Sequence, residues 1–400
     1  MSVNTRIKDP VADFHRSQAK HVTRWHNVSF PDIWLLFALM TLVTIGMVMV
    51  TSASTPIALQ SGAEKLYFVK RQGIFYGVSF ICAYIAFSQP VNTFFKHADK
   101  ILILSIIMLF LVFMPGIGYA ANGAHRWLNL GPIKLQSGEV AKLAVILYAA
   151  AFLTKNRIKL EHSWTPVFLL LLVGAAFSAL LLKQPDFGTT AVILTTLLGM
   201  MFLAGIPLGR FLVLGAVAVT AMGFILVAAP YRVKRLIMFL DPFKYQYDEG
   251  YQLANSLVAI GRGGIHGVGL GDSVFKHQFV PEAHTDFIFS IIAEELGLIG
   301  SLIVMSIYTL LIWRAFMIGQ LADRVRKRFH AYVAYGIGLW IGIQTLINMG
   351  VVTGVLPTKG LTLPLISYGG SSLMITGIAL GILARVDGEA RFQAKREGIL

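Results

Sequence analysis

The chain has 400 residues, of which 56% are hydrophobic and only 14% are charged. A soluble domain carries roughly 25% charged residues, so this composition excludes an ordinary soluble protein and predicts a polytopic membrane protein. The net charge of +14 does not indicate nucleic-acid binding, because the basic residues lie mostly in tails and interhelical loops, where they encode topology. The single cysteine, Cys82, excludes an internal disulfide and a multi-cysteine metal site.

Ten apolar runs follow a polar, basic segment at residues 1–32, which is expected to be a cytoplasmic N-terminal tail. The runs predict an all-α domain of ten transmembrane helices over residues 33–384, because each has close to the ~20 apolar residues that cross a bilayer. Their expected ranges are 33–53, 72–88, 101–117, 139–154, 166–182, 187–205, 211–229, 286–313, 330–352 and 364–384. Residues 385–400 are expected to be a cytoplasmic C-terminal tail.

The distribution of lysine and arginine predicts that both termini are cytoplasmic, since the segments on that side of the membrane are richer in these residues. This orientation places two informative loops outside. One covers residues 119–139, and the other is a large periplasmic loop at residues 230–285, between the seventh and eighth helices. The second loop contains apolar and aromatic residues and glycine-rich turns, which predict a folded cap rather than a disordered linker.

The stretch 279–297 places four carboxylates at the start of an apolar run: Glu282, Asp286, Glu294 and Glu295. Ionisable residues in a membrane span are costly, so each needs a partner, a water-filled cavity or a function. If the helix begins near Thr285, Asp286 lies in its first turn, where free N–H groups favour a carboxylate. Asp286 and Glu294 then share a helix face. The alternative interpretation is that Asp286 only caps the helix.

Polar residues gather in five segments that the expected topology places at the outer face. The segments contain Arg126, Trp127, Lys134, Gln136, Glu139 and Lys142; Gln184 and Asp186; Arg232, Lys234 and Arg235; Glu282, His284, Thr285 and Asp286; and Lys359 and Ser367 within LPTKGLTLPLISYGGSS. The prolines and paired glycines of the last segment favour non-helical backbone, which is tolerated at membrane depth when it is buried or lines a cavity. Several cations beside a few carboxylates suit a ligand with an anionic head and an apolar tail.

Each of these segments also has a structural interpretation. Glu139 and Lys142 stand at i, i+3 and could simply pair with each other. Asp186 could cap the following helix, and Arg126 with Trp127 could anchor the chain at the membrane interface. The Gly-Gly-Ser-Ser run could serve close helix packing.

The chain has no Walker sequence and no dinucleotide fingerprint, and no cytoplasmic segment is long enough to hold a nucleotide. No nucleotide or organic cofactor is therefore expected, and ATP-driven chemistry is disfavoured. A search for the matched broken helices of transporter repeats finds no convincing pair.

The motifs PEAHTDFIF, GRGGIHGVGLGDS and LPTKGLTLPLISYGGSS resemble those of the SEDS family of cell-wall polymerases. QPDFGT, the GAHRW loop and the ten apolar runs extend the resemblance over nearly the whole chain after residue 30. PEAH before Thr285, GLGDS and the long N-terminal tail are more similar to the division-site members than to the elongation members. One departure is Ser137, because the family usually has proline after the glutamine at this point.

The resemblance implies a peptidoglycan glycosyltransferase that polymerises lipid II at the outer face of the cytoplasmic membrane, at the division septum. It places the catalytic aspartate at Asp286, and a positioned carboxylate can take the proton of the acceptor hydroxyl. Cations expected to hold the pyrophosphates are Arg126, Lys142, Arg235 and Lys359. Further expected substrate-binding residues are Lys134, Glu139, Gln184, Asp186, Arg232, Glu282, His284, Thr285 and Ser367. The site could also bind a divalent cation, Mg²⁺ or Mn²⁺, between the phosphate oxygens and the carboxylate of Asp186 or Asp286.

The resemblance further implies a complex with a class B penicillin-binding protein, a transpeptidase, and with other division proteins. Ala334, Gly338 and Gly342 stand at i, i+4, i+8 and predict a smooth stripe on the span at 330–352. The stripe is expected either to dock this partner or to pack against a neighbouring span of the same chain. Two other functions remain as alternatives: a lipid II flippase, and a non-catalytic scaffold for which the Asp286 cluster would be surplus.

Overall fold

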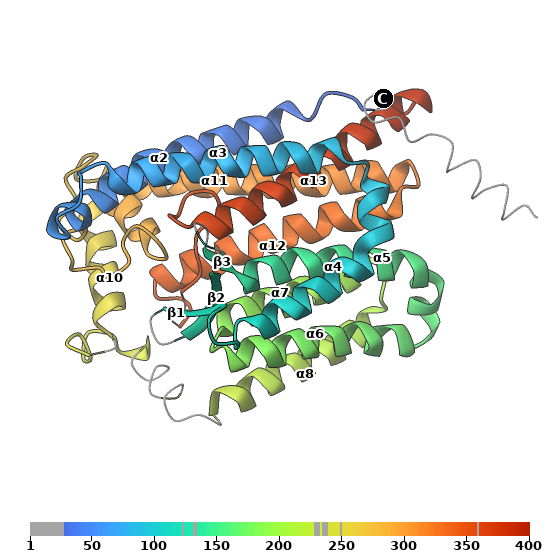
Figure 1. Ribbon diagram of the computed structural model, residues 1–400, viewed down its shortest axis with the longest axis horizontal. Helices are drawn as coiled ribbons and strands as arrows, with labels where there is room; N and C mark the ends of the chain where they lie inside the picture. Colours follow the sequence, from blue (N-terminus) through green and yellow to red (C-terminus); the bar gives the residue numbers. More distant parts are fainter. Residues whose placement is uncertain are drawn as a thin grey trace, which may run out of the picture.

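The computed structural model is a bundle of long helices with a small β-sheet and a loop region gathered at one end (Figure 1). The structure describes residues 28–121, 124–129, 131, 134–227, 233, 239–248, 250–357 and 360–400. Three of the expected binding residues, Arg232, Arg235 and Lys359, lie outside these residues, and so does residue range 1–27 of the expected N-terminal tail.

Within the described residues, ten long helices overlap the ten apolar runs, although α4 begins ten residues before the expected span at 101–117 and ends six residues before its end. They are α2 (Ile33–Gln60), α3 (Tyr67–Ser88), α4 (Val91–Leu111), α5 (Ser137–His162), α6 (Thr165–Lys183), α7 (Phe187–Leu203), α8 (Leu208–Val227), α11 (Ile288–Arg324), α12 (Arg328–Val352) and α13 (Gly370–Arg396). A shorter helix, α10 (Tyr251–Gly263), lies in the expected large loop. Six of the long helices have the length and apolar composition of membrane spans: α2, α5, α6, α11, α12 and α13.

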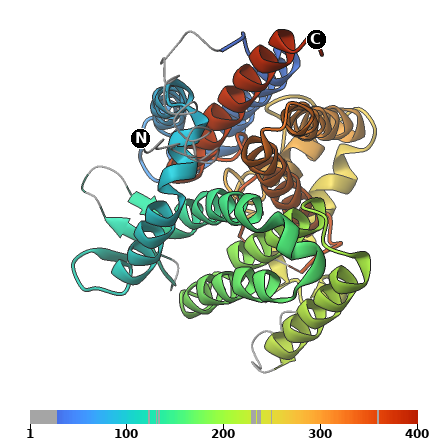
Figure 2. The same ribbon diagram turned by 90° about the vertical axis from the view of Figure 1, so that its right-hand side faces the viewer.

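Helices from the N-terminal and C-terminal parts of the chain lie side by side. α13 packs along α3, and α11 packs against both α2 and α12. The end-on view places α8 at the edge of the bundle, where its main neighbour is α7 (Figure 2). Large apolar side chains stay exposed on the outer helices, among them Phe80 on α3, Phe168 on α6 and Phe224 on α8. An apolar surface of this kind is unusual in a soluble protein and is expected to face lipid.

The expectation of an all-α fold is wrong for the loop at residues 119–139. This loop contains a three-stranded antiparallel sheet of β1 (Gly118–Ala121), β2 (Ala124–Asn129) and β3 (Lys134–Gln136), in that order. The strands have three to six residues, too few to produce a clear alternation of apolar and polar positions. Because β3 leads directly into α5, the sheet fixes where that helix begins.

Several helix limits differ from the expected spans. α11 begins at Ile288 rather than at Thr285, so Asp286 lies in a turn ahead of the helix. α11 is also broken at Gly297, whose φ of 67° and ψ of −163° are not helical. α13 begins only at Gly370 and continues to Arg396, so most of the expected C-terminal tail is helix.

The small-residue stripe on α12 is buried inside the chain. Ala334, Gly338 and Gly342 are all buried, and the α-carbons of the two glycines face side chains of α11. A Cβ on Gly338 would lie 3.1 Å from the Cβ of Ala315, and a Cβ on Gly342 would lie 3.3 Å from Ile312. The stripe therefore packs against a neighbouring helix, and the interpretation that it docks a partner is wrong.

Candidate active site

Asp286 lies in a tight turn that precedes α11. The turn starts at Glu282, which has a left-handed backbone (φ 56°), and the N–H of Thr285 donates to the Glu282 carbonyl at 3.0 Å. The Thr285 hydroxyl donates to Glu282 Oε2 at 2.8 Å. α11 has no side-chain N-cap, so the interpretation of Asp286 as a capping acid is wrong. Within the described residues the Asp286 carboxylate forms no ion pair, although the residue is partly buried.

The backbone of this turn is held by the amide of Asn348 on α12. The Asn348 Nδ2 group donates one hydrogen to the Asp286 carbonyl at 2.7 Å and the other to the Leu361 carbonyl at 2.6 Å. One side chain therefore joins the aspartate turn to the non-helical segment 360–369. The two are in close contact, since a Cβ on Gly360 would lie 2.7 Å from Asp286 Oδ2.

Residues further along the same segment bind the turn from the other side. The Ser367 hydroxyl donates to the Thr285 carbonyl at 2.6 Å and accepts from the Leu363 N–H at 2.7 Å. The N–H of Tyr368 donates to the His284 carbonyl at 2.9 Å. The expected residues Ser367, His284 and Thr285 thus lie close to Asp286. Both hydrogen bonds of the Ser367 hydroxyl go to backbone groups, so this side chain holds the backbone of the turn and of its own segment in place.

The electrostatic environment raises the pKa of Asp286 to about 6. Burial is the main cause because it disfavours the charged carboxylate, and the negative charge of Glu282 adds to it. The positive charge of Arg126 acts in the opposite direction, which places that residue within electrostatic reach of Asp286. Burial also lowers the pKa of the His284 imidazole, whose ring packs against the rings of Phe68 and Tyr368. These shifts leave Asp286 able to gain and lose a proton near neutral pH.

Arg126 projects from β2 and binds the turn between α6 and α7. Its guanidinium donates to the carbonyls of Gln184, at 3.1 Å, and Pro185, at 2.6 Å. The Gln184 side chain in turn donates to the Leu109 carbonyl at 2.9 Å. The first two polar segments predicted at the outer face therefore meet, and part of the Arg126 guanidinium stays accessible.

Asp186 is the N-cap of α7, as its structural interpretation predicted. Its Oδ1 accepts from the Thr189 N–H at 3.1 Å, and its Oδ2 accepts from the Thr189 hydroxyl at 2.9 Å and from Gln136 at 3.4 Å. Both oxygens are thus occupied, so Asp186 fits a metal site poorly. The described residues contain no group of three His, Cys, Asp or Glu side chains that could hold a metal ion.

Glu139 and Lys142 form the predicted i, i+3 pair, with Nζ to Oε1 at 2.9 Å, and both are buried. Lys142 Nζ also donates to Gln344 Oε1 at 2.6 Å. The amide of Gln344 then donates to the Thr362 carbonyl at 2.8 Å. With the Lys142 side chain only 1% exposed, its ammonium serves this internal network and presents no surface to a ligand.

Lys134 is not part of this cluster, because it is exposed on β3 with its ammonium 4.0 Å from the centre of the Tyr119 ring. In contrast, Gln344 and Asn348 are central to the site but were not predicted. The signal was available, because two amide side chains at i, i+4 in an apolar run are costly unless they bind partners. Both residues support the segment that lies against Asp286.

The long apolar helices, the lipid-facing surface and the polar cluster at one end define a multi-pass membrane protein. The family of cell cycle proteins that includes FtsW, RodA and SpoVE matches residues 33–392. The chain therefore belongs to the FtsW/RodA/SpoVE family of membrane proteins.

Similar proteins agree with this assignment. The chain is 56% identical to the probable peptidoglycan glycosyltransferase FtsW of Dichelobacter nodosus, over 96% of this chain and 97% of that one. It is 43% identical to the protein of the same name from Legionella pneumophila, over 92% and 93% of the two chains.

Two solved structures share the fold. One is a chain of a peptidoglycan synthase complex that coordinates polymerization and crosslinking, with a TM-score of 0.75, 30% identity, and 90% and 98% of the two chains covered. The other is the rod shape determining protein RodA of Thermus thermophilus, with a TM-score of 0.65, 28% identity, and 91% and 98% coverage.

Proposed function

We propose that this chain is a peptidoglycan glycosyltransferase that polymerises lipid II into glycan strands during septal cell division. The observation that carries the proposal is Asp286, a partly buried residue whose carboxyl group has a raised pKa and forms no ion pair in the described part of the chain. Its relatives from Dichelobacter nodosus and Legionella pneumophila carry the name of this activity, and they match over more than nine-tenths of the chain.

Asp286 is the general base of the proposed reaction. The 4-hydroxyl of the acceptor GlcNAc attacks the anomeric carbon of the donor MurNAc and passes its proton to the carboxylate. The new glycosidic C–O bond forms as the bond to the lipid pyrophosphate breaks, and the pyrophosphate leaves with the bonding electron pair. A base whose pKa lies close to the working pH is both ionised and able to accept a proton, and a pKa of about 6 meets this condition.

The cations bind the two pyrophosphates in this proposal. Among the residues that the structure describes, Arg126 is the candidate for pyrophosphate binding, because it is partly exposed and lies within electrostatic reach of Asp286. Lys359 precedes Gly360, which touches Asp286, so its ammonium is proposed to stabilise the leaving group together with Arg232 and Arg235. Lys142 acts indirectly, through Gln344 and the segment 360–369. Thr285, Ser367, His284 and Gln184 shape the site.

A divalent cation, Mg²⁺ or Mn²⁺, would be held by Asp286 with pyrophosphate oxygens, and its charge would offset that of the leaving group.

We propose that ten helices span the cytoplasmic membrane, with both termini cytoplasmic and residues 230–285 outside. The proposed transpeptidase partner is a class B penicillin-binding protein. The similarity to a chain of a peptidoglycan synthase complex supports such a partner.

Purified protein with labelled lipid II in liposomes tests the function, because polymerisation and translocation can be measured on one sample. The wild-type chain is expected to make glycan strands. Asp286→Asn keeps the size of the side chain but cannot take a proton, so polymerisation should fall by about 10² to 10⁴. Asp99→Asn, at an exposed carboxylate on α4 paired with Lys155, is the control and should polymerise normally.

Three results would contradict the proposal. Near wild-type polymerisation by Asp286→Asn would remove its catalytic role. Translocation of lipid II without polymer, unchanged by Asp286→Asn, would indicate a flippase. Partner recruitment without either activity would indicate a scaffold.

A further inference from the structure

The break in α11 separates a short helical segment, residues 288–296, from the rest of the helix. Gly297 interrupts the helix with φ 67° and ψ −163°. Asp286 lies two residues ahead of the short segment at one end, and Glu294 and Glu295 lie near its other end. The segment therefore connects the candidate base to two buried carboxylates.

The loop that follows α10 fills the break with backbone hydrogen bonds. It donates to two carbonyls before the break and accepts from two N–H groups after it. The four bonds run from Val268 N to Glu294 O (3.0 Å), Gly269 N to Glu295 O (3.1 Å), Leu298 N to Gly264 O (2.9 Å) and Ile299 N to Ile265 O (3.2 Å). Groups that a continuous helix would satisfy internally are thus satisfied by another part of the chain.

Glycines make this close contact feasible. A Cβ on Gly267 would overlap the Glu295 carbonyl, and a Cβ on Gly263 would overlap the Ala293 carbonyl. A Cβ on Gly297 would overlap the Gly267 N–H group, and the positive φ of Gly297 also favours glycine. The loop and the broken helix therefore fit together without space for another side chain.

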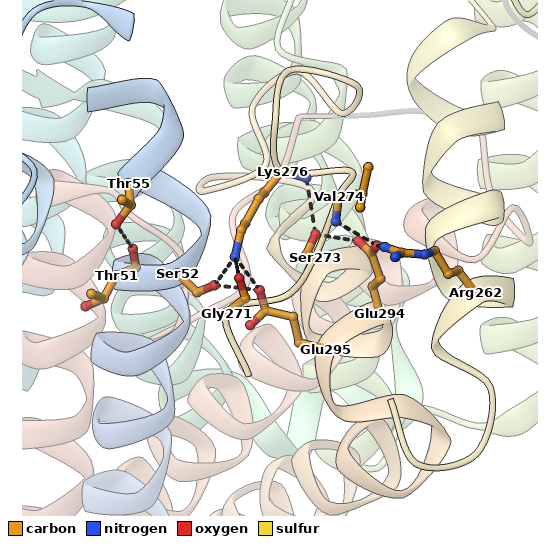
Figure 3. Close-up of polar contacts among 10 residues, drawn as sticks. All are labelled: Thr51, Ser52, Thr55, Arg262, Gly271, Ser273, Val274, Lys276, Glu294 and Glu295. Carbon is orange, nitrogen blue, oxygen red and sulfur yellow. Dashed lines mark hydrogen bonds and ion pairs between the residues drawn. The ribbon is translucent and has the colours of Figure 1, made fainter. Parts of the chain in front are cut away.

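The side chain of Glu294 binds α10 and the loop (Figure 3). It is fully buried and forms an ion pair with Arg262 at 2.6 Å. It also accepts hydrogen bonds from the Val274 N–H, at 3.0 Å, and from the Ser273 hydroxyl. Glu294 thus holds the end of the short segment to the last turn of α10.

Glu295 points to the other side and binds α2 through Lys276 (Figure 3). The Lys276 ammonium lies 2.9 Å from Glu295 Oε1 and 3.0 Å from the Ser52 hydroxyl of α2, and it also donates to the Gly271 carbonyl. Ser52 donates to the same Glu295 oxygen at 2.5 Å. The lysine and the carboxylate are both nearly inaccessible, so this ion pair is held within the protein.

We propose that Glu294 and Glu295 are positioning residues for the candidate base, a proposal that rests on the assigned role of Asp286. By binding α10, α2 and the loop, they fix the orientation of the short segment at its hinge, Gly297. Asp286 lies about 15 Å from that hinge, because a helix rises about 1.5 Å per residue. A tilt of about 4° would move the carboxylate by about 1 Å, and a displacement of this size can lower a rate about 10²-fold.

The double variant Glu294→Gln/Glu295→Gln tests the proposal, because it removes both charges and keeps the side-chain size. We expect kcat for lipid II polymerisation to fall at least about tenfold with KM changed less than about twofold. Hydrogen exchange of the amides at 285–290 should become faster. The matched control is Glu389→Gln, a partly buried carboxylate in the C-terminal half of α13 that pairs with Arg385 and His330, and it should change neither.

Ser52 provides a milder test that does not depend on removing a buried charge. Ser52→Ala should lower kcat about threefold and speed exchange at 285–290, whereas Ser52→Thr, which keeps the hydroxyl, should restore both. Exchange that rises only in the loop at 264–276 would overturn the proposal, and so would wild-type kcat in the double variant while Asp286→Asn is inactive. Activity of Asp286→Asn would instead overturn the proposed function, and the exchange measurement would still decide the positioning role.

Discussion

Asp32 and Asp286 each lie just ahead of a long helix, but their carboxylates have opposite environments. Asp32 caps α2, with Oδ1 accepting from the Leu35 N–H at 2.9 Å. It is also bound by two arginines, Arg314 of α11, whose Nε lies 3.0 Å from Oδ1, and Arg391 of α13. Asp286 is not the N-cap of α11, its backbone carbonyl accepts from Asn348, and its carboxylate forms no ion pair within the part of the chain that the structure describes.

The two pKa values follow from these contacts. Burial alone would raise the pKa of Asp32, but the hydrogen bond and charge of Arg314, with the charge of Arg391, hold it below its usual value. Burial and Glu282 raise the pKa of Asp286 to about 6. The neighbours of each aspartate thus decide its state. The arginines keep Asp32 ionised in a structural ion pair, whereas burial and Glu282 favour the protonated form of Asp286.

The largest expected effect is on stability, from Asp32→Asn. This change removes the carboxylate that pairs with Arg314 and one of the two that pair with Arg391, which keeps Asp387. It should lower the free energy of unfolding by about 3 kcal/mol, the low end for a broken buried pair, because the arginines are partly exposed. Asp286→Asn should not destabilise. A carboxylate whose folded pKa is raised favours the fold at low pH and loses that contribution as pH rises through about 6. Thermal unfolding in detergent at pH 7.5 measures both, and equal losses would break the comparison.

Asn348→Leu should have an intermediate effect, because it removes the two hydrogen bonds that join the aspartate turn to the segment 360–369 through this side chain. The carbonyls of Asp286 and Leu361 would lose their partner, each at a cost of about 1–3 kcal/mol if no water replaces it. We expect kcat to fall about tenfold or more in the lipid II assay. Asn255→Leu is the matched control, since that amide donates to the Tyr251 carbonyl of its own helix. Equal activity of the two variants would show that Asn348 does not set the geometry of the site.

The smallest expected effect is a shift in the pH profile. A base with a pKa of about 6 must be ionised, so the rate should fall about tenfold for each pH unit below that value. Glu282→Gln removes one cause of the raised pKa and keeps the acceptor for Thr285, so the acidic limb should move to lower pH. Glu64→Gln, an exposed glutamate paired with Lys70, should leave the limb unchanged. A limb that stays in place in Glu282→Gln would assign the shift to burial alone.

Features that depend on nearby residues were predictable from the sequence. Each of the ten apolar runs overlaps a long helix in the described part of the chain. The pairing of Glu139 with Lys142 and the cap formed by Asp186 also depend on neighbours within four residues, and both interpretations are confirmed.

Features that depend on distant contacts were not predictable. The helix was expected from Thr285, but the hydrogen bonds of that residue to Glu282 form a turn and delay the helix by three residues. Gly297 is one glycine in an apolar run and gives no local sign of a break, which is completed by hydrogen bonds from a loop about 30 residues earlier. The partners of Glu294 and Glu295 likewise come from segments far away in the sequence.

The ion pairs of Asp32 also have a consequence for biosynthesis. Arg314 follows Asp32 by 282 residues and Arg391 follows it by 359 residues. At about 5–20 residues per second, a ribosome takes roughly 20–70 s to cover the longer interval. During that time α2 is already made, but the carboxylate just ahead of it lacks Arg391. The nascent protein therefore cannot complete this junction until α13 emerges, and a chain truncated before α13 would keep the ion pair of Asp32 with Arg314 but lack the one with Arg391.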